Sequence, residues 1–136
     1  VVGSSAFAWN FTVQAQEIRP ENGAFILPVS AFQDGKARHF QYKNAQGHPI
    51  RFFVVKSKDG SLRSAFDACE VCFRAKKGYV QQGSDMICVN CGLKFRTDKI
   101  GEFKGGCNPV PLKSEVRGDK LIISQQNVEA GLRYFK

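Results

Sequence analysis

The chain has 136 residues, of which 43% are hydrophobic and 24% charged. This length is typical of one globular domain, and it supports a core that needs no disulfide staples. The net charge of +8 suits an anionic partner such as nucleic acid, an anionic membrane surface or an acidic protein, but Lys and Arg are spread along the chain, which favours an ordinary solvated basic surface.

Residues 1–9 are predicted to be the end of an export signal or membrane anchor. Ala6 and Ala8 place small residues at alternate positions, as a signal peptidase requires, after a weakly apolar run. The alternative is an ordinary N-terminal segment, because neither a charged start nor a long apolar run is present. Residues 10–136 are predicted to form a single β-rich domain.

Residues 10–66 predict one strand after another. The β-rich stretches are GAFILPVSAF, ARHFQYKN and HPIRFFVVKSKDGSLRSAFDA, and the last contains Asp59-Gly60, a strong hairpin signal. We therefore expect an antiparallel sheet of at least four strands. Pro28 and Pro49 should lie at strand ends or edges, since proline cannot donate to a strand ladder.

The periodicity disappears between Cys69 and Pro111 and returns afterwards. SEVRGDKLIIS predicts two short strands around Gly118-Asp119, and the segment after Ser124, a helix-capping residue, has apolar residues at helical spacing as far as Phe135. The predicted fold is thus mainly β: an antiparallel sheet or sandwich-like domain with a Cys-rich, irregular metal-binding segment at 67–111 and a short C-terminal helix.

Four of the five cysteines form two Cys-x-x-Cys pairs, Cys69 with Cys72 and Cys88 with Cys91, separated by fifteen residues. Each pair can turn its two sulfurs toward one point, and Gly92 follows the second pair, where a tight turn requires positive φ. Four thiolates select zinc, iron or an iron-sulfur cluster over hard cations. The pattern therefore predicts a thiolate metal site.

Other uses of the cysteines fit less well. A disulfide framework is disfavoured by the odd number of cysteines and by the strain of a bridge between residues this close in sequence. A thioredoxin-like redox pair requires a helix after the pair, and none is predicted. The fifth thiol, Cys107, stands in KGGCNPVPL and is open to three interpretations: a cluster ligand, a thiol beside the ligands, or a buried cysteine.

Hydrolytic catalysis is not indicated. The sequence has no Ser/His/Asp set, no carboxylate pair and no phosphate-binding glycine loop, and the two histidines, His39 and His48, lie on a predicted strand and turn outside the cysteine segment. We expect structural or surface roles for both, and an electron carrier rather than a catalyst.

Residues 23–135 resemble the FtrD-like family of membrane iron-sulfur containing proteins. The resemblance is carried by IRFFVVKSKDG, by FDACEVCFRAKKGYVQQGSDMICVNCGLKF and by KGGCNPVPL. It implies a ferredoxin-like extracytoplasmic domain associated with bacterial ferrous-iron uptake, with Cys69, Cys72, Cys88 and Cys91 as cluster ligands and Cys107 as the family-like fifth thiol.

The leading hypothesis is a periplasmic electron-transfer domain that holds an iron-sulfur cluster or thiolate-bound iron and serves a membrane permease or an iron-oxidising or iron-binding partner. Five basic residues near the thiolates are candidates for raising the reduction potential and docking an acidic partner: Arg74, Lys76, Lys77, Lys94 and Arg96. The alternatives are a zinc-ribbon binding module, and a metallochaperone or self-assembling surface protein. Nucleic acid is a poor fit, because the segment lacks exposed aromatics interleaved with basic residues.

Overall fold

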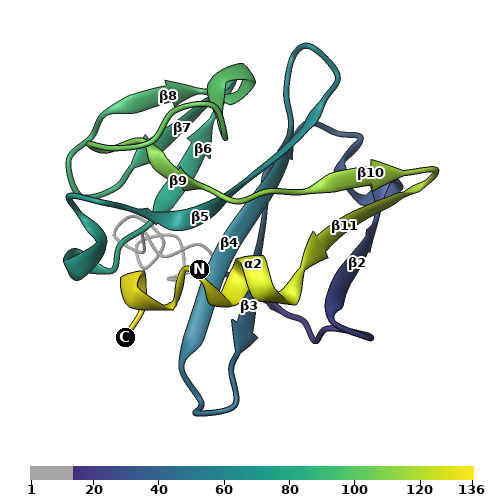
Figure 1. The fold of residues 1–136 in the computed structure, drawn as a ribbon. Helices are drawn as coiled ribbons and strands as arrows, with labels where there is room; N and C mark the ends of the chain where they lie inside the picture. The colour runs from purple at the N-terminus through teal and green to yellow at the C-terminus, as the bar shows by residue number, and fades with distance from the viewer. Residues whose placement is uncertain (1–13) are drawn as a thin grey trace, which may run out of the picture.

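The structure is a computed structural model that describes residues 14–136 (Figure 1). The predicted export-signal remnant, residues 1–9, lies outside the described residues. The strands are β1 Gln16–Glu17, β2 Ala24–Pro28, β3 Arg38–Lys43, β4 Pro49–Lys56, β5 Leu62–Cys69, β6 Tyr79–Gln82, β7 Asp85–Cys88, β8 Lys94–Arg96, β9 Pro109–Pro111, β10 Glu115–Arg117 and β11 Lys120–Ser124. The helical elements are α2 Gln125–Glu129 and the 3-10 turns η1 Val29–Phe32, η2 Phe73–Ala75, η3 Thr97–Lys99 and η4 Leu132–Tyr134.

A five-stranded sheet in the order β1-β3-β4-β5-β9 forms the middle of the molecule. Its pairings are antiparallel except for β1, which runs parallel to β3. The predicted hairpin joins β4 to β5, where Ser57 N donates to Ser61 O at 2.9 Å and Gly60 has a φ of +89°. Pro28 ends β2 and Pro49 begins β4, as expected for proline.

Strand β4 is buried on both faces. Phe52 and Val54 face one hydrophobic core, and Phe53 and Val55 face a second core on the other side of the sheet. Successive side chains of a strand point to opposite faces, so the unbroken apolar run FFVV marks a strand covered on both sides.

The first core lies between this sheet and a second one, in the order β10-β11-β2, with α2 beside it (Figure 1). Ser124 caps α2, because its side chain accepts a hydrogen bond from Asn127 N. The helix ends at Glu129, earlier than the spacing predicted, and a 3-10 turn follows Gly131. A Cβ at position 131 would overlap the Phe66 ring, so the backbone there is packed directly against β5.

The second core lies between the central sheet and a small antiparallel sheet in the order β6-β7-β8. Segment 67–111 is therefore more regular than its sequence predicted, although turns and loops join its strands. These strands are only three or four residues long, too short for an alternating pattern to stand out.

The predicted fold class is confirmed: the protein is mainly β, with antiparallel sheets and one short C-terminal α-helix among the described residues. Within residues 14–136, none of the helices has the length and apolar character needed to cross a membrane.

Candidate metal centre

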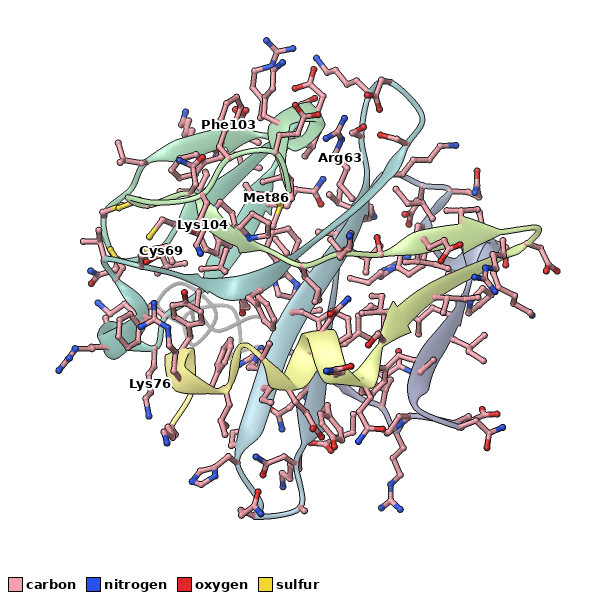
Figure 2. All side chains as sticks on the ribbon, in the orientation of Figure 1. Arg63, Cys69, Lys76, Met86, Phe103 and Lys104 are labelled. Carbon is pink, nitrogen blue, oxygen red and sulfur yellow. The ribbon has the colours of Figure 1, made fainter. Side chains whose placement is uncertain are left out.

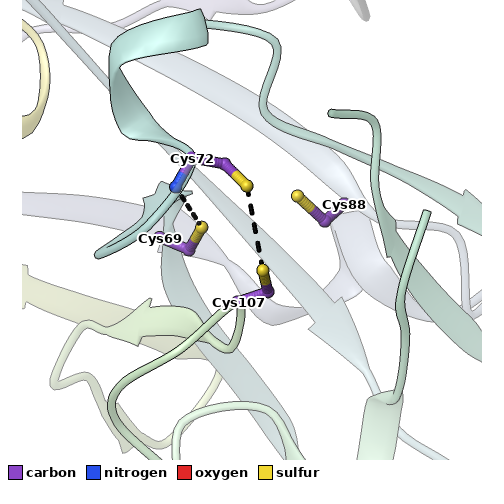
Figure 3. A group of neighbouring side chains, drawn as sticks. All are labelled: Cys69, Cys72, Cys88 and Cys107. Carbon is purple, nitrogen blue, oxygen red and sulfur yellow. Dashed lines mark hydrogen bonds between the residues drawn. The ribbon is translucent and has the colours of Figure 1, made fainter. Parts of the chain in front are cut away.

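Four thiols from three separate segments converge at the edge of the second core (Figure 3). The Sγ atoms of Cys69, Cys72, Cys88 and Cys107 all lie within 4.8 Å of one another. All five cysteines are free thiols in the described part of the chain, so the disulfide framework considered above is not formed.

Strand pairing explains how the three segments meet. Cys69 ends β5 and pairs with Pro109 of β9, which brings the preceding loop and its Cys107 beside β5. Cys88 ends β7 and pairs with Tyr79 of β6, and Tyr79 in turn donates its hydroxyl hydrogen to the backbone carbonyl of Cys107. Strand pairing therefore brings Cys88 and Cys107 to the turn that holds Cys69 and Cys72.

The first cysteine of each pair receives backbone amides. Cys72 N lies 3.0 Å from Cys69 Sγ, and the amides of Asn90 and Cys91 face the Cys88 thiol and act to lower its pKa. Amides donated to sulfur stabilise a thiolate and fix its orientation. Both turns therefore direct backbone amides at the sulfur of their first cysteine.

The spacing of the sulfurs fits a single metal ion. Four sulfurs at tetrahedral bond lengths of about 2.3 Å from one ion stand about 3.8 Å apart, and Cys72 Sγ and Cys107 Sγ are 3.7 Å apart. A four-iron cluster binds each cysteine to a different iron atom and spreads the sulfurs more widely. Four thiolates at this spacing can hold one iron or zinc ion.

The surroundings of the thiols shift their pKa values in opposite directions. Burial raises the pKa of Cys88 to about 12, while a hydrogen bond from the Asn90 side chain is the main cause that lowers the pKa of Cys72 to about 7. The contact with Cys91, followed by burial, raises the pKa of Cys107 above its usual range. Close thiols cannot all ionise without a positive charge between them, and a bound cation supplies that charge.

The sequence assigned Cys91 to the ligand pairs, but the structure places it outside the four-sulfur group. Cys91 is exposed, and its Sγ donates to Cys107 Sγ at 3.1 Å. Cys107, the residue left open by the sequence, stands among the four.

Asp67 contributes to the site by joining β5 to β6. Its carboxylate accepts a hydrogen bond from Tyr79 N at 2.8 Å, and His39 Nε2 lies 3.1 Å from Tyr79 O and 3.8 Å from Asp67 Oδ1. Burial raises the pKa of Asp67 and lowers that of His39. The predicted structural role of His39 agrees with this position, in which it helps to join β3, β5 and β6.

Gly78 allows Asp67 to reach β6. Its φ is +67°, and a Cβ at this position would stand 2.5 Å from Asp67 Oδ2. Sequence reasoning missed Asp67, Gly78 and Tyr79 as supports of the site. A glycine next to the aromatic that begins a strand was the available signal, but only the fold brings it against the carboxylate.

A cavity of about 410 Å³ opens beside the thiols. Cys69, Cys72 and Cys88 form part of its wall, and its basic lining includes Arg51, Lys76, Lys77 and Lys136. Positive side chains therefore line the same cavity as three of the four cysteines.

The predicted docking residues are all exposed. Lys76 and Lys77 border the cavity, and Lys76 projects from the ribbon into solvent (Figure 2). Arg74 lies over the Phe73 ring, and Arg96 pairs with Asp98 at 2.7 Å. Lys94 begins β8, three residues after Cys91.

The FtrD-like family model, described as membrane iron-sulfur containing protein FtrD-like, matches residues 32–135, well over half of the chain. The match includes all five cysteines and the supporting residues Asp67, Gly78 and Tyr79. No curated protein and no solved structure was found to match the chain.

Proposed function

Because this chain belongs to the FtrD-like family of membrane iron-sulfur containing proteins, we propose that it transfers electrons through iron held by its four converging thiols. The observation that carries the proposal is the meeting of four Sγ atoms within 4.8 Å, from three segments that only the fold brings together. The proposed ligands are Cys69, Cys72, Cys88 and Cys107.

When bound, a single iron held by four thiolates supplies reversible one-electron transfer. The chain determines its surroundings. Cys69 and Cys88 are only 1% and 2% exposed, which limits the contact of their sulfurs with water, although both residues also line the cavity together with Cys72. Backbone amides at Cys69 and Cys88 and the nearby cations favour the more negative, reduced state and so raise the reduction potential.

The surroundings of the thiols also suit a protein partner. Each of the three cysteine-bearing segments has one exposed apolar residue: Val71 is 65% exposed, Leu93 54% and Phe103 53%. Phe103 and the neighbouring Lys104 are labelled in Figure 2. Exposed apolar residues with basic residues around them suit a partner whose interface has an apolar centre and acidic residues at its edge.

The proposed setting is the extracytoplasmic face of a membrane, in association with ferrous-iron uptake. The proposed partner is a membrane permease or a periplasmic iron-oxidising or iron-binding protein. The description of the family as membrane proteins supports this setting. In an oxidising compartment close thiols form disulfides, and bound metal protects them from this oxidation.

The test is metal analysis and visible absorption of protein purified without oxygen, followed by voltammetry. We expect one iron per chain, no acid-labile sulfide, a coloured oxidised form and a reversible one-electron wave. Cys69→Ser, Cys72→Ser, Cys88→Ser and Cys107→Ser should each lose most of the iron. A colourless protein that retains zinc and has no redox wave would instead support the zinc-ribbon alternative and contradict electron transfer.

A further inference from the structure

The structure brings five thiols together, and one ion needs only four. Cys91 is the exposed thiol, and its Sγ lies 3.1 Å from Cys107 Sγ, which is itself 3.7 Å from Cys72 Sγ. The sulfurs thus form a path from the surface through Cys107 to the buried side of the group, where Cys69 and Cys88 lie.

The backbone explains why Cys91 stays outside. Cys88 N donates to Leu93 O at 3.0 Å and Gly92 N donates to Cys88 O at 2.7 Å, so the turn is closed around Cys88. Gly92 has a φ of +79° and no atom within 4 Å of a Cβ built on it, which places the turn at the surface. The backbone amide of Cys91 serves Cys88, while its thiol faces Cys107 at the rim.

We propose that Cys91 is an exchange ligand that receives a soft divalent metal ion together with Cys107 and hands it to the buried thiols. The inference rests on the metal centre of the proposed function, but not on electron transfer. On entry, the Cys91 and Cys107 thiols each lose a proton to water, and each sulfur displaces one water ligand from the metal as it forms a metal–sulfur bond. The bond to Cys91 breaks as a buried thiol binds the metal and releases its own proton, and Cys91 is then reprotonated.

No oxidation or reduction is involved, because only metal–sulfur bonds and protons are exchanged. A thiol held beside a resident ligand acts at a high local concentration, and it can hold the metal while another ligand is replaced. The reverse sequence serves release to an external chelator.

The first test maps free thiols in protein loaded with Zn²⁺. Iodoacetamide treatment and intact mass spectrometry should show one fast adduct, located at Cys91, with the zinc retained. Protection of Cys91 equal to that of Cys69 and Cys88, or zinc loss in step with its alkylation, would make Cys91 a resident ligand and overturn the proposal.

The second test follows Co²⁺ uptake, and its removal by EDTA, through the sulfur-to-cobalt absorption band. Cys91→Ser should keep the wild-type band and one Co²⁺ per chain, but both rates should fall by about tenfold or more. Unchanged rates, or a band reduced as in Cys107→Ser, would contradict the proposal.

Ala75→Ser is the matched control, since it changes an exposed residue of η2, just after the other Cys-x-x-Cys turn, and should leave both rates unchanged. The outcomes also separate the two proposals. A wild-type protein that binds no Co²⁺ through four thiolates would remove the centre itself. A normal Co²⁺ centre without an iron redox wave would remove only electron transfer.

Discussion

At the scale of single residues, the centre depends on side chains that do not bind metal. Tyr79 connects the three cysteine-bearing segments, because its amide reaches Asp67, its hydroxyl reaches the Cys107 carbonyl and its strand partner is Cys88. Asp67 can occupy its buried position only because residue 78 is a glycine. The positions of the sulfurs therefore depend on the contacts that Tyr79 and Asp67 make.

Gly78→Ala tests this support, with Gly83→Ala as the matched control. Both glycines have positive φ, +67° and +59°, but only at position 78 would the new Cβ meet Asp67. Both changes strain the backbone, and Gly78→Ala should cost about 1–3 kcal/mol more by displacing a buried hydrogen-bonded carboxylate. Urea unfolding of the metal-free proteins measures the difference, and equal losses would show that Asp67 adjusts freely.

At the scale of elements, β4 separates the first hydrophobic core from the second, which contains Cys69 and Cys88. Phe52 packs with Phe25 and Phe40 in the first core. Phe53 lies in the second core, 5.6 Å from the His39 ring and 6.0 Å from the Tyr79 ring between centroids. Alternate side chains of one strand thus contribute to the stability of the fold on one face and to the packing around the metal site on the other.

Substituting these neighbours one at a time separates the two roles. Phe52→Leu and Phe53→Leu should each lower the free energy of unfolding of the metal-free protein by about 1–2 kcal/mol, because both side chains are fully buried. Only Phe53→Leu should also speed the removal of Co²⁺ by EDTA, since it loosens the packing around Tyr79. Equal metal release from both variants would mean that the cores are not separate in their effects.

At the scale of the whole molecule, the net charge of +8 is partly concentrated around the cavity that three of the cysteines line. Lys76 and Lys77 line the cavity beside three of the sulfurs, whereas Lys58 follows β4 at its hairpin and Lys120 begins β11. A charged reactant should therefore respond to the position of a lysine and not only to the total charge.

The rate at which ferricyanide oxidises the reduced iron-loaded protein tests this expectation. Lys76→Glu with Lys77→Glu should slow the reaction by about tenfold at low salt, and the difference should shrink as salt screens it. Lys58→Glu with Lys120→Glu makes the same change in net charge and should have a much smaller effect. Identical slowing in both double variants would leave total charge as the sole cause.

The sequence alone determined the mainly β character of the fold, the hairpin at Asp59-Gly60 and the cysteine-rich site, because turn residues and cysteine spacing are local signals. It could not determine the β6-β7-β8 sheet, whose strands are too short to carry a pattern.

Only the tertiary structure decided which four sulfurs meet. Spacing pairs Cys88 with Cys91, but it does not say which sulfur a turn directs inward. The pairing of Cys69 with Pro109 brings Cys107 into the group, and the surface turn leaves Cys91 at its rim. The physical reason is that a metal site is a convergence in space, and pairing between strands that are distant in the sequence determines that convergence.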